Sequence, residues 1–386
     1  MQFRDLKQQY HTLKAGIDKA ILDVAASGAY VMGPAVVELE RMLADYVGTR
    51  HCLSCASGTN ALMLALKAWG IGHGDAVFVP DFTFFASAEA VSSVGATPVF
   101  VDVDRETFNI NPADLENKIQ ATIREGELLP KVIMAVDLFG LPANYPAIRT
   151  IADNHHLLIL EDGAQGFGGA VDGKRCCSFG DISTTSFFPA KPLGCYGDGG
   201  ACFTDNDKWA ALIGSYRMHG KGASKYENVR IGMNSRLDTI QAAILQVKLQ
   251  AFDKELAAIN KAAAEYTARL ADIVETPAVP AGFQSSWAQY TIKLNSNAER
   301  NGLQAYLKGL GIPSMVYYPC PLHRQIAYRN SGQPESGYPV ADNLCDTVLS
   351  LPIHPYISLE EITDVCNAIK TFLQRENGHQ GESGQA

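Results

Sequence analysis

Short apolar segments alternate with segments of helical periodicity between about residues 48 and 205. Segments this apolar are typical of strands that are buried on both faces of a parallel sheet. Six segments have this character: HCLSCAS (51–57), AVFVP (76–80), TPVFVDV (97–103), KVIMAVDL (131–138), LLILED (157–162) and ISTTSFF (182–188). Between the first two, Leu62, Leu66 and Trp69 have the i, i+4, i+7 spacing of one buried helix face, and PAIRTIADNH (146–155) predicts another helix. The pattern therefore predicts a doubly wound α/β core.

The pattern changes in the second half of the chain. Periodicity predicts helices over 207–220 and about 237–270, the second with a break near Ala257-Ala258. After residue 285 we expect a mixed fold, with strands over 286–294 and 313–319 and helices over 298–311 and 358–373. The chain is thus predicted to form a large, mostly parallel sheet domain with an N-terminal arm (1–250), a smaller α+β domain (251–375) and a disordered tail (376–386).

Composition narrows the function classes. The formal net charge is −9 and no basic block is present, so nucleic acid is not an expected partner. The polar N-terminus lacks a signal-peptide core, and no apolar run of 18 residues predicts a membrane span. Nine cysteines, an odd number, fit reduced thiols in the cytoplasm. Cys52 and Cys55 form a single C-x-x-C, which we interpret as small apolar residues on a buried strand, and no metal site is predicted.

Ser57-Gly58-Thr59 lies where a strand passes into a helix. Unpaired N–H groups at a helix N-terminus bind phosphate well, and glycine lets an anion approach the backbone. An ordinary helix cap explains the same residues, so the local pattern leaves both interpretations open. A dinucleotide fingerprint (strand, G-x-G-x-x-G, helix) is missing, which argues against a nicotinamide-dependent oxidoreductase.

Two further positions can carry chemistry. LLILED brings Asp162 to the end of a strand, where ligands bind in open α/β sheets, and Gln165 follows three residues later. The acid alternatively caps the next helix. Lys191 lies in SFFPAKPLGCYGDGG, where Pro192 disfavours a helix. A lysine in such apolar surroundings favours the neutral amine, which is a nucleophile for carbonyls.

These parts together suggest pyridoxal 5′-phosphate (PLP). This cofactor needs a lysine to bond to its aldehyde, a carboxylate at its ring nitrogen, an anion cradle and a flat group against its ring. Lys191, Asp162, the 57–59 segment and an aromatic residue of PDFTFFASAEA (80–90) can supply all four.

The motifs ASGTNALMLAL, PDFTFFASAEA, EDGAQGFGG, SFFPAKPLGCYGDGG and GMNSRLDTIQAAIL resemble those of the DegT/DnrJ/EryC1/StrS sugar aminotransferases. The resemblance implies the fold-type I aspartate aminotransferase architecture and a homodimer. It also implies a set of roles: covalent attachment of PLP (Lys191), pairing with the ring nitrogen (Asp162), a bond to the ring hydroxyl (Gln165), stacking (Phe84), phosphate binding (Gly58, Thr59, Ser186), phosphate binding across the dimer (Asn234), carboxylate binding (Arg236) and the sugar pocket (Tyr317, His323, Arg324).

Within the family, SFFPAKPLGCYGDGG and GMNSRLDT are most similar to enzymes that aminate UDP-2-acetamido-2-deoxy-3-keto-glucuronic acid. This implies transfer of an amino group from L-glutamate to C3 of a UDP-keto-sugar on a route to O-antigen or lipopolysaccharide. Two alternatives stay open: amination at C4 of a 4-keto-6-deoxy sugar, and a PLP-binding regulatory protein without turnover. Some relatives have histidine in place of Lys191 and act as dehydratases, so the lysine argues against that reaction.

Overall fold

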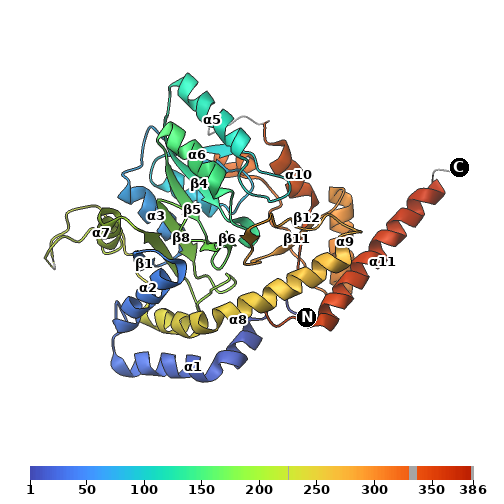
Figure 1. Ribbon diagram of the computed structural model, residues 1–386, viewed down its shortest axis with the longest axis horizontal. Coiled ribbons are helices and arrows are strands. Elements are labelled where there is room, and N and C mark those ends of the chain that lie inside the picture. Colours follow the sequence, from blue (N-terminus) through green and yellow to red (C-terminus); the bar gives the residue numbers. More distant parts are fainter. Residues whose placement is uncertain (225, 330–336, 384–386) are drawn as a thin grey trace.

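A mostly parallel sheet of seven strands forms the centre of the computed structural model, which describes residues 1–224, 226–329 and 337–383 (Figure 1). Its strands are, in spatial order, β1 (His51–Cys55), β9 (Gly200–Thr204), β8 (Ile182–Ser186), β5 (Leu158–Asp162), β4 (Leu129–Val136), β2 (Asp75–Pro80) and β3 (Thr97–Val101). Only β9 runs antiparallel to its neighbours. All six predicted strands are confirmed.

Helices cover both faces of this sheet, because alternate side chains of each strand point to opposite sides. Val77 and Val79 of β2 belong to the apolar cluster that includes Leu62 and Leu66, whereas Ala76 and Phe78 belong to the cluster on the other face. The covering helices are α2 (Pro34–Val47), α3 (Gly58–Ala68), α4 (Ala86–Ser93), α5 (Pro112–Glu125), α6 (Tyr145–His155) and α7 (Asp207–Tyr216). The predicted doubly wound architecture is confirmed.

Two long helices lie side by side. The N-terminal helix α1 (Leu6–Ser27) lies along α8 (Thr239–Leu270), as the lower part of Figure 1 shows. Helix α8 is continuous past Ala257 and Ala258, so the predicted break is absent there. The N-terminal end of α8 packs in the apolar cluster that includes α2, β1 and β9, and its C-terminal end packs in the apolar cluster of the C-terminal part. The domain boundary predicted at residue 250 therefore falls inside a single helix.

The C-terminal part has its own apolar cluster around a two-stranded antiparallel sheet. Its elements are β11 (Tyr290–Lys293), α9 (Asn297–Gly309), α10 (Pro339–Thr347), β12 (Val348–Leu351) and α11 (Leu359–Ser383). A small three-stranded sheet comprises β6 (Ala170–Val171), β7 (Lys174–Arg175) and β10 (Phe283–Gln284), and short 3₁₀ turns span Leu138–Gly140, Leu322–Arg324 and Ile326–Tyr328.

Two predictions for this part differ from the structure. Residues 313–319 form no strand, and Met315 makes only an isolated bridge to Ser350. The tail predicted to be disordered from residue 376 continues α11 as far as Ser383, whereas 384–386 lie outside the described residues. In the described part of the chain, no helix is long and apolar enough to cross a membrane.

Candidate active site

The predicted site forms where three elements of the sheet domain end. Strand β5 ends at Asp162, β8 ends at Ser186, and α3 begins at Gly58. Strands β5 and β8 are parallel neighbours, so their C-terminal ends lie at the same edge of the sheet. This edge is where open α/β sheets bind ligands.

Asp162 is a buried carboxylate with two hydrogen bonds. The Ser87 hydroxyl donates to Oδ2 at 2.8 Å, and the Ala164 N–H donates to Oδ1 at 3.2 Å. Burial raises the pKa of Asp162, while these bonds and the nearby charge of Lys191 oppose the rise. A carboxylate in this setting is stabilised further by a cation placed against it, as a protonated ring nitrogen would be.

Lys191 belongs to a loop whose backbone is held at several points. Its N–H donates to the Phe188 carbonyl at 2.8 Å, and the Gly194 carbonyl accepts a 2.6 Å bond from the ammonium of Lys248. A Cβ at Gly194 would lie 2.4 Å from the Pro189 carbonyl oxygen, so this close turn requires glycine. Burial lowers the pKa of Lys191, although the charge of Asp162 opposes this. The loop thus presents an amine that loses its proton more readily than a surface lysine.

An anion cradle lies at the start of α3. Ser57 caps the helix, because its Oγ accepts the Asn60 N–H at 3.1 Å. The N–H groups of Gly58 and Thr59 have no partner among the described residues. A Cβ at Gly58 would lie 2.7 Å from Cβ of Ser186, so only glycine lets these two segments converge. Ser57 therefore caps the helix while the N–H groups of Gly58 and Thr59 stay available, and these donors fit a phosphate.

Gln165, Tyr318 and Phe84 form a group of neighbouring side chains. The Gln165 amide nitrogen donates to the Tyr318 hydroxyl at 3.1 Å, and its oxygen accepts the Phe139 N–H at 2.6 Å. The ring of Phe84 is 56% exposed and lies 6.2 Å from the Tyr318 ring, centre to centre. Phe84 therefore has a ring face open to a flat ligand, and Gln165 has a second amide hydrogen to donate.

Comparisons with known proteins decide the family. The model of the DegT/DnrJ/EryC1/StrS aminotransferase family matches residues 11–370. The chain belongs to this aminotransferase family. The enzymes of the family depend on PLP, so the cofactor predicted from the sequence is confirmed.

Relatives of this aminotransferase cover nearly all of the chain. It is 43% identical to the UDP-2-acetamido-2-deoxy-3-oxo-D-glucuronate aminotransferase of Pseudomonas aeruginosa, over 96% of this chain and 99% of that one. It is 39% identical to the UDP-N-acetyl-3-dehydro-α-D-glucosamine 3-aminotransferase of Acidithiobacillus ferrooxidans, over 96% and 97%. A crystal structure of a family member from Brucella abortus superimposes with a TM-score of 0.94, at 49% identity over 97% and 99% of the two chains. The predicted fold type is thereby confirmed.

Besides Asp162, the aminotransferase contains a pair of buried carboxyl groups, Glu161 and Asp137. The Glu161 carboxylate accepts hydrogen bonds from the N–H groups of Cys177, Phe179 and Gly180 and from the Ser183 hydroxyl. Asp137 lies against it, and burial followed by the charge of Glu161 raises its pKa. Asp137, Glu161 and Cys176 are close enough to hold a metal ion. However, the Glu161 oxygens are already occupied by donors, so a proton held by Asp137 explains the pair without a metal.

Asn234 and Arg236 are hydrogen-bonded to each other, and among the described residues neither forms a hydrogen bond or ion pair with another predicted site residue. Asn234 is exposed, and its Oδ1 accepts a 2.8 Å hydrogen bond from Nε of Arg236. The phosphate contact of Asn234 across a dimer and the carboxylate binding of Arg236 stay predictions.

His323 and Arg324 have partners of their own in the aminotransferase. His323 is buried, with Nδ1 2.6 Å from the carboxylate of Asp81, and Arg324 forms an ion pair with Asp342 at 2.9 Å. These contacts show how segment 321–324 is anchored to the end of β2, and they favour an indirect role for His323 in the predicted sugar pocket.

The sequence analysis missed three residues of the site. Ser87 lies in a quoted motif, and Tyr318 is next to the predicted Tyr317, so local signals existed for both. Arg4, on the N-terminal arm, donates to the Lys191 carbonyl at 3.4 Å. Nothing in FRDLKQQY marks it as a site residue.

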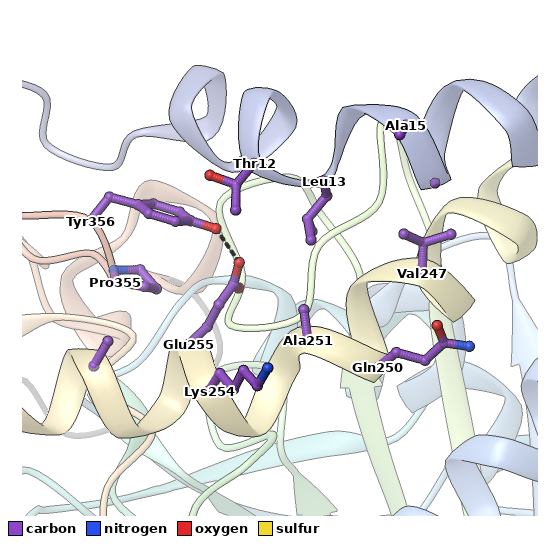
Figure 2. A pocket seen from close by; sticks show the side chains of 12 residues that line it. Thr12, Leu13, Ala15, Val247, Gln250, Ala251, Lys254, Glu255, Pro355 and Tyr356 are labelled. Atoms are coloured by element: carbon purple, nitrogen blue, oxygen red, sulfur yellow. Dashed lines mark hydrogen bonds between the residues drawn. The ribbon is translucent and has the colours of Figure 1, made fainter.

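A separate groove of about 530 Å³ runs between α1 and α8. Figure 2 shows its lining, with Leu13 of α1 pointing toward Ala251 of α8 and Tyr356 hydrogen-bonded to Glu255. None of the predicted site residues lines this groove, so it is distinct from the site at the sheet edge.

Proposed function

We propose that the protein transfers the amino group of L-glutamate to C3 of UDP-2-acetamido-2-deoxy-3-keto-glucuronic acid. The proposal is carried by the nearby charges of buried Asp162 and Lys191, which act on each other, in a chain that is 43% identical, almost end to end, to a 3-oxo-glucuronate aminotransferase. The 3-aminotransferase from Acidithiobacillus ferrooxidans supports the same carbon. A place in O-antigen or lipopolysaccharide synthesis and a cytoplasmic location remain predictions from the sequence.

Each residue has a defined task in this reaction. When bound, PLP supplies an aldehyde that bonds to amino groups and a ring that takes up the electrons left by a broken C–H bond. Asp162 would hold a proton on the ring nitrogen of the bound cofactor, which would keep the ring able to accept those electrons. Lys191 would bind the cofactor and serve as general base and acid, and its lowered pKa favours the neutral amine that a general base needs.

We also propose a homodimer with shared sites. Asn234 and Arg236 are not occupied by contacts to this chain's own site, and the segment before them exposes Val229 (51%) and Ile231 (87%). Exposed apolar side chains of this size suit a protein interface. In such a dimer Asn234 would reach the partner's cofactor phosphate.

The test is product analysis by mass spectrometry. The PLP-loaded protein is incubated with L-glutamate and either the 3-keto-uronate or a UDP-4-keto-6-deoxy sugar, with Lys191→Ala as the control. We expect an amino group in the uronate product only, and none with the variant. Turnover of the 4-keto sugar alone would establish the C4 alternative. A cofactor absorbance spectrum that glutamate does not change would favour a regulatory binder.

A further inference from the structure

The N-terminal arm fixes Arg4 beside the loop of Lys191. The arm is anchored on both sides of this residue. The Phe3 carbonyl accepts the Ile353 N–H at 3.3 Å, and Asp5 caps α1 by accepting the Gln8 N–H at 2.8 Å. Because both neighbours are tied down, the backbone of Arg4 is fixed beside this loop.

The Arg4 guanidinium has only neutral partners. Nη1 donates to the Ala288 carbonyl at 3.2 Å and Nη2 to the Lys191 carbonyl at 3.4 Å. Among the residues that the structure describes, no carboxylate lies within ion-pair distance of Arg4. Glu255, whose charge acts on it from farther away, is bonded to Gln9 at 2.8 Å and to Tyr356.

An unpaired guanidinium in this position is costly unless an anion joins it. Burial lowers the pKa of Arg4 to about 10, so the group stays charged at neutral pH. Its charge also lowers the pKa of Lys191, whose carbonyl accepts the hydrogen bond from Arg4 Nη2. Arginine prefers carboxylates as bidentate partners, and more than half of its five N–H donors are unused here.

We propose that Arg4 binds the carboxylate of a substrate in the active site and makes the enzyme selective for acidic substrates. The inference rests on the proposed function, in which the amino donor and the sugar acceptor are both carboxylates. Arg4 lies beside the Lys191 loop of its own chain and would bind a carboxylate in addition to Arg236, for which the sequence predicts carboxylate binding.

Binding of unreactive ligands to the PLP-loaded enzyme tests this directly. Isothermal titration calorimetry compares UDP-2-acetamido-2-deoxy-glucuronic acid with UDP-N-acetylglucosamine, which has a neutral hydroxymethyl group in place of the carboxylate. It also measures glutarate as an analogue of the donor. The variant is Arg4→Gln, whose amide still donates to a backbone carbonyl. Lys7→Gln removes an exposed positive charge from the same arm and serves as the matched control.

We expect Arg4→Gln to lower the affinity for one of the two carboxylate ligands by about 10- to 100-fold. The affinity for UDP-N-acetylglucosamine should fall by less than about twofold. A loss with the uronate shows that Arg4 binds the acceptor, and a loss with glutarate shows that it binds the donor. Unchanged affinity for both acids overturns the inference, as does an equal loss with the neutral sugar, which would indicate a structural or diphosphate contact. Wild-type protein that fails to aminate the keto-uronate refutes the proposed function instead, whatever the variant does.

Discussion

Lys248 of α8 supports the active-site loop from behind, and replacing it with methionine changes how stability depends on pH. The side chain is 2% exposed. Its ammonium donates to the Gly194 carbonyl at 2.6 Å and lies 4.4 Å from the centre of the Tyr196 ring. Burial lowers the pKa of Lys248 from 10.5 to about 8, although the charge of Glu255 opposes this.

The shift in the pKa sets the magnitude. A fall from 10.5 to about 8 corresponds to roughly 3.4 kcal/mol of lost stability, at ~1.36 kcal/mol per pKa unit. The folded protein releases this proton before the unfolded chain does. The cost is therefore fully present below pH 8 and disappears as the pH rises toward 10.5. Methionine removes the cost, but it also removes a charged hydrogen bond worth ~1.5–3 kcal/mol and a cation–π contact worth ~1–2 kcal/mol.

These terms nearly cancel at pH 7, so we expect the free energy of unfolding of Lys248→Met to lie within about 1–2 kcal/mol of the wild-type value at that pH. Between pH 7 and pH 10 the free energy of unfolding of the wild type should rise by ~2–3 kcal/mol relative to that of the variant. Urea unfolding of the PLP-loaded proteins at several pH values measures this difference. Lys254→Met, at an exposed position of the same helix, is the control. A wild-type-minus-variant difference that stays constant from pH 7 to pH 10 would refute the reasoning.

Three further changes test other parts of the site. Asp162→Asn keeps an acceptor for the Ser87 hydroxyl but loses the charge, so we expect glutamate turnover to fall by ~100-fold or more at unchanged PLP content; a loss below fivefold contradicts the assigned role. Gly58→Ala places a Cβ against Ser186 and should weaken PLP binding about tenfold in a fluorescence titration, whereas Gly214→Ala, which meets open space, should not. The pKa of Asp137 is raised, so wild-type stability should fall as the pH rises above the unfolded value near 4. Asp137→Asn should weaken that fall in thermal unfolding, and an identical pH profile would show that Asp137 is not protonated.

Local patterns carried the prediction of the central sheet, because strands buried on both faces must be apolar throughout. The same rule placed Asp162 at a strand end, whereas Ser186 was marked only by the family resemblance. Strand β9 was missed because its start at Gly200 follows a run of glycines that resembles a loop. Residues 313–319 failed for the opposite reason. They are rich in strand-forming residues, but Pro313 and Pro319 cannot donate to a ladder.

Contacts between distant segments could not be predicted in the same way. His323 lies in a motif that suggested a sugar pocket, yet its partner Asp81 precedes it by 242 residues. Arg4 reaches Lys191 across 187 residues because α1 lies along α8 and brings the N-terminus back to the sheet. No periodicity or spacing encodes such a meeting, since it depends on how whole elements pack. Residues supplied by the arm are therefore visible only in the folded chain.

The placement of charge, more than its total, decides what this site can bind. With a net charge of −9 the chain as a whole repels an anionic nucleotide sugar. Salt screens that repulsion beyond about 8–10 Å, so the groups at the site dominate once a ligand is close. There, Asp162 interacts with the nearby charge of Lys191 and would be matched to a cation on the cofactor. The Arg4 guanidinium is bonded only to backbone carbonyls in the described chain, and the N–H groups of Gly58 and Thr59 are available for a phosphate. A substrate that brings a carboxylate balances this set, whereas a neutral sugar leaves Arg4 unpaired.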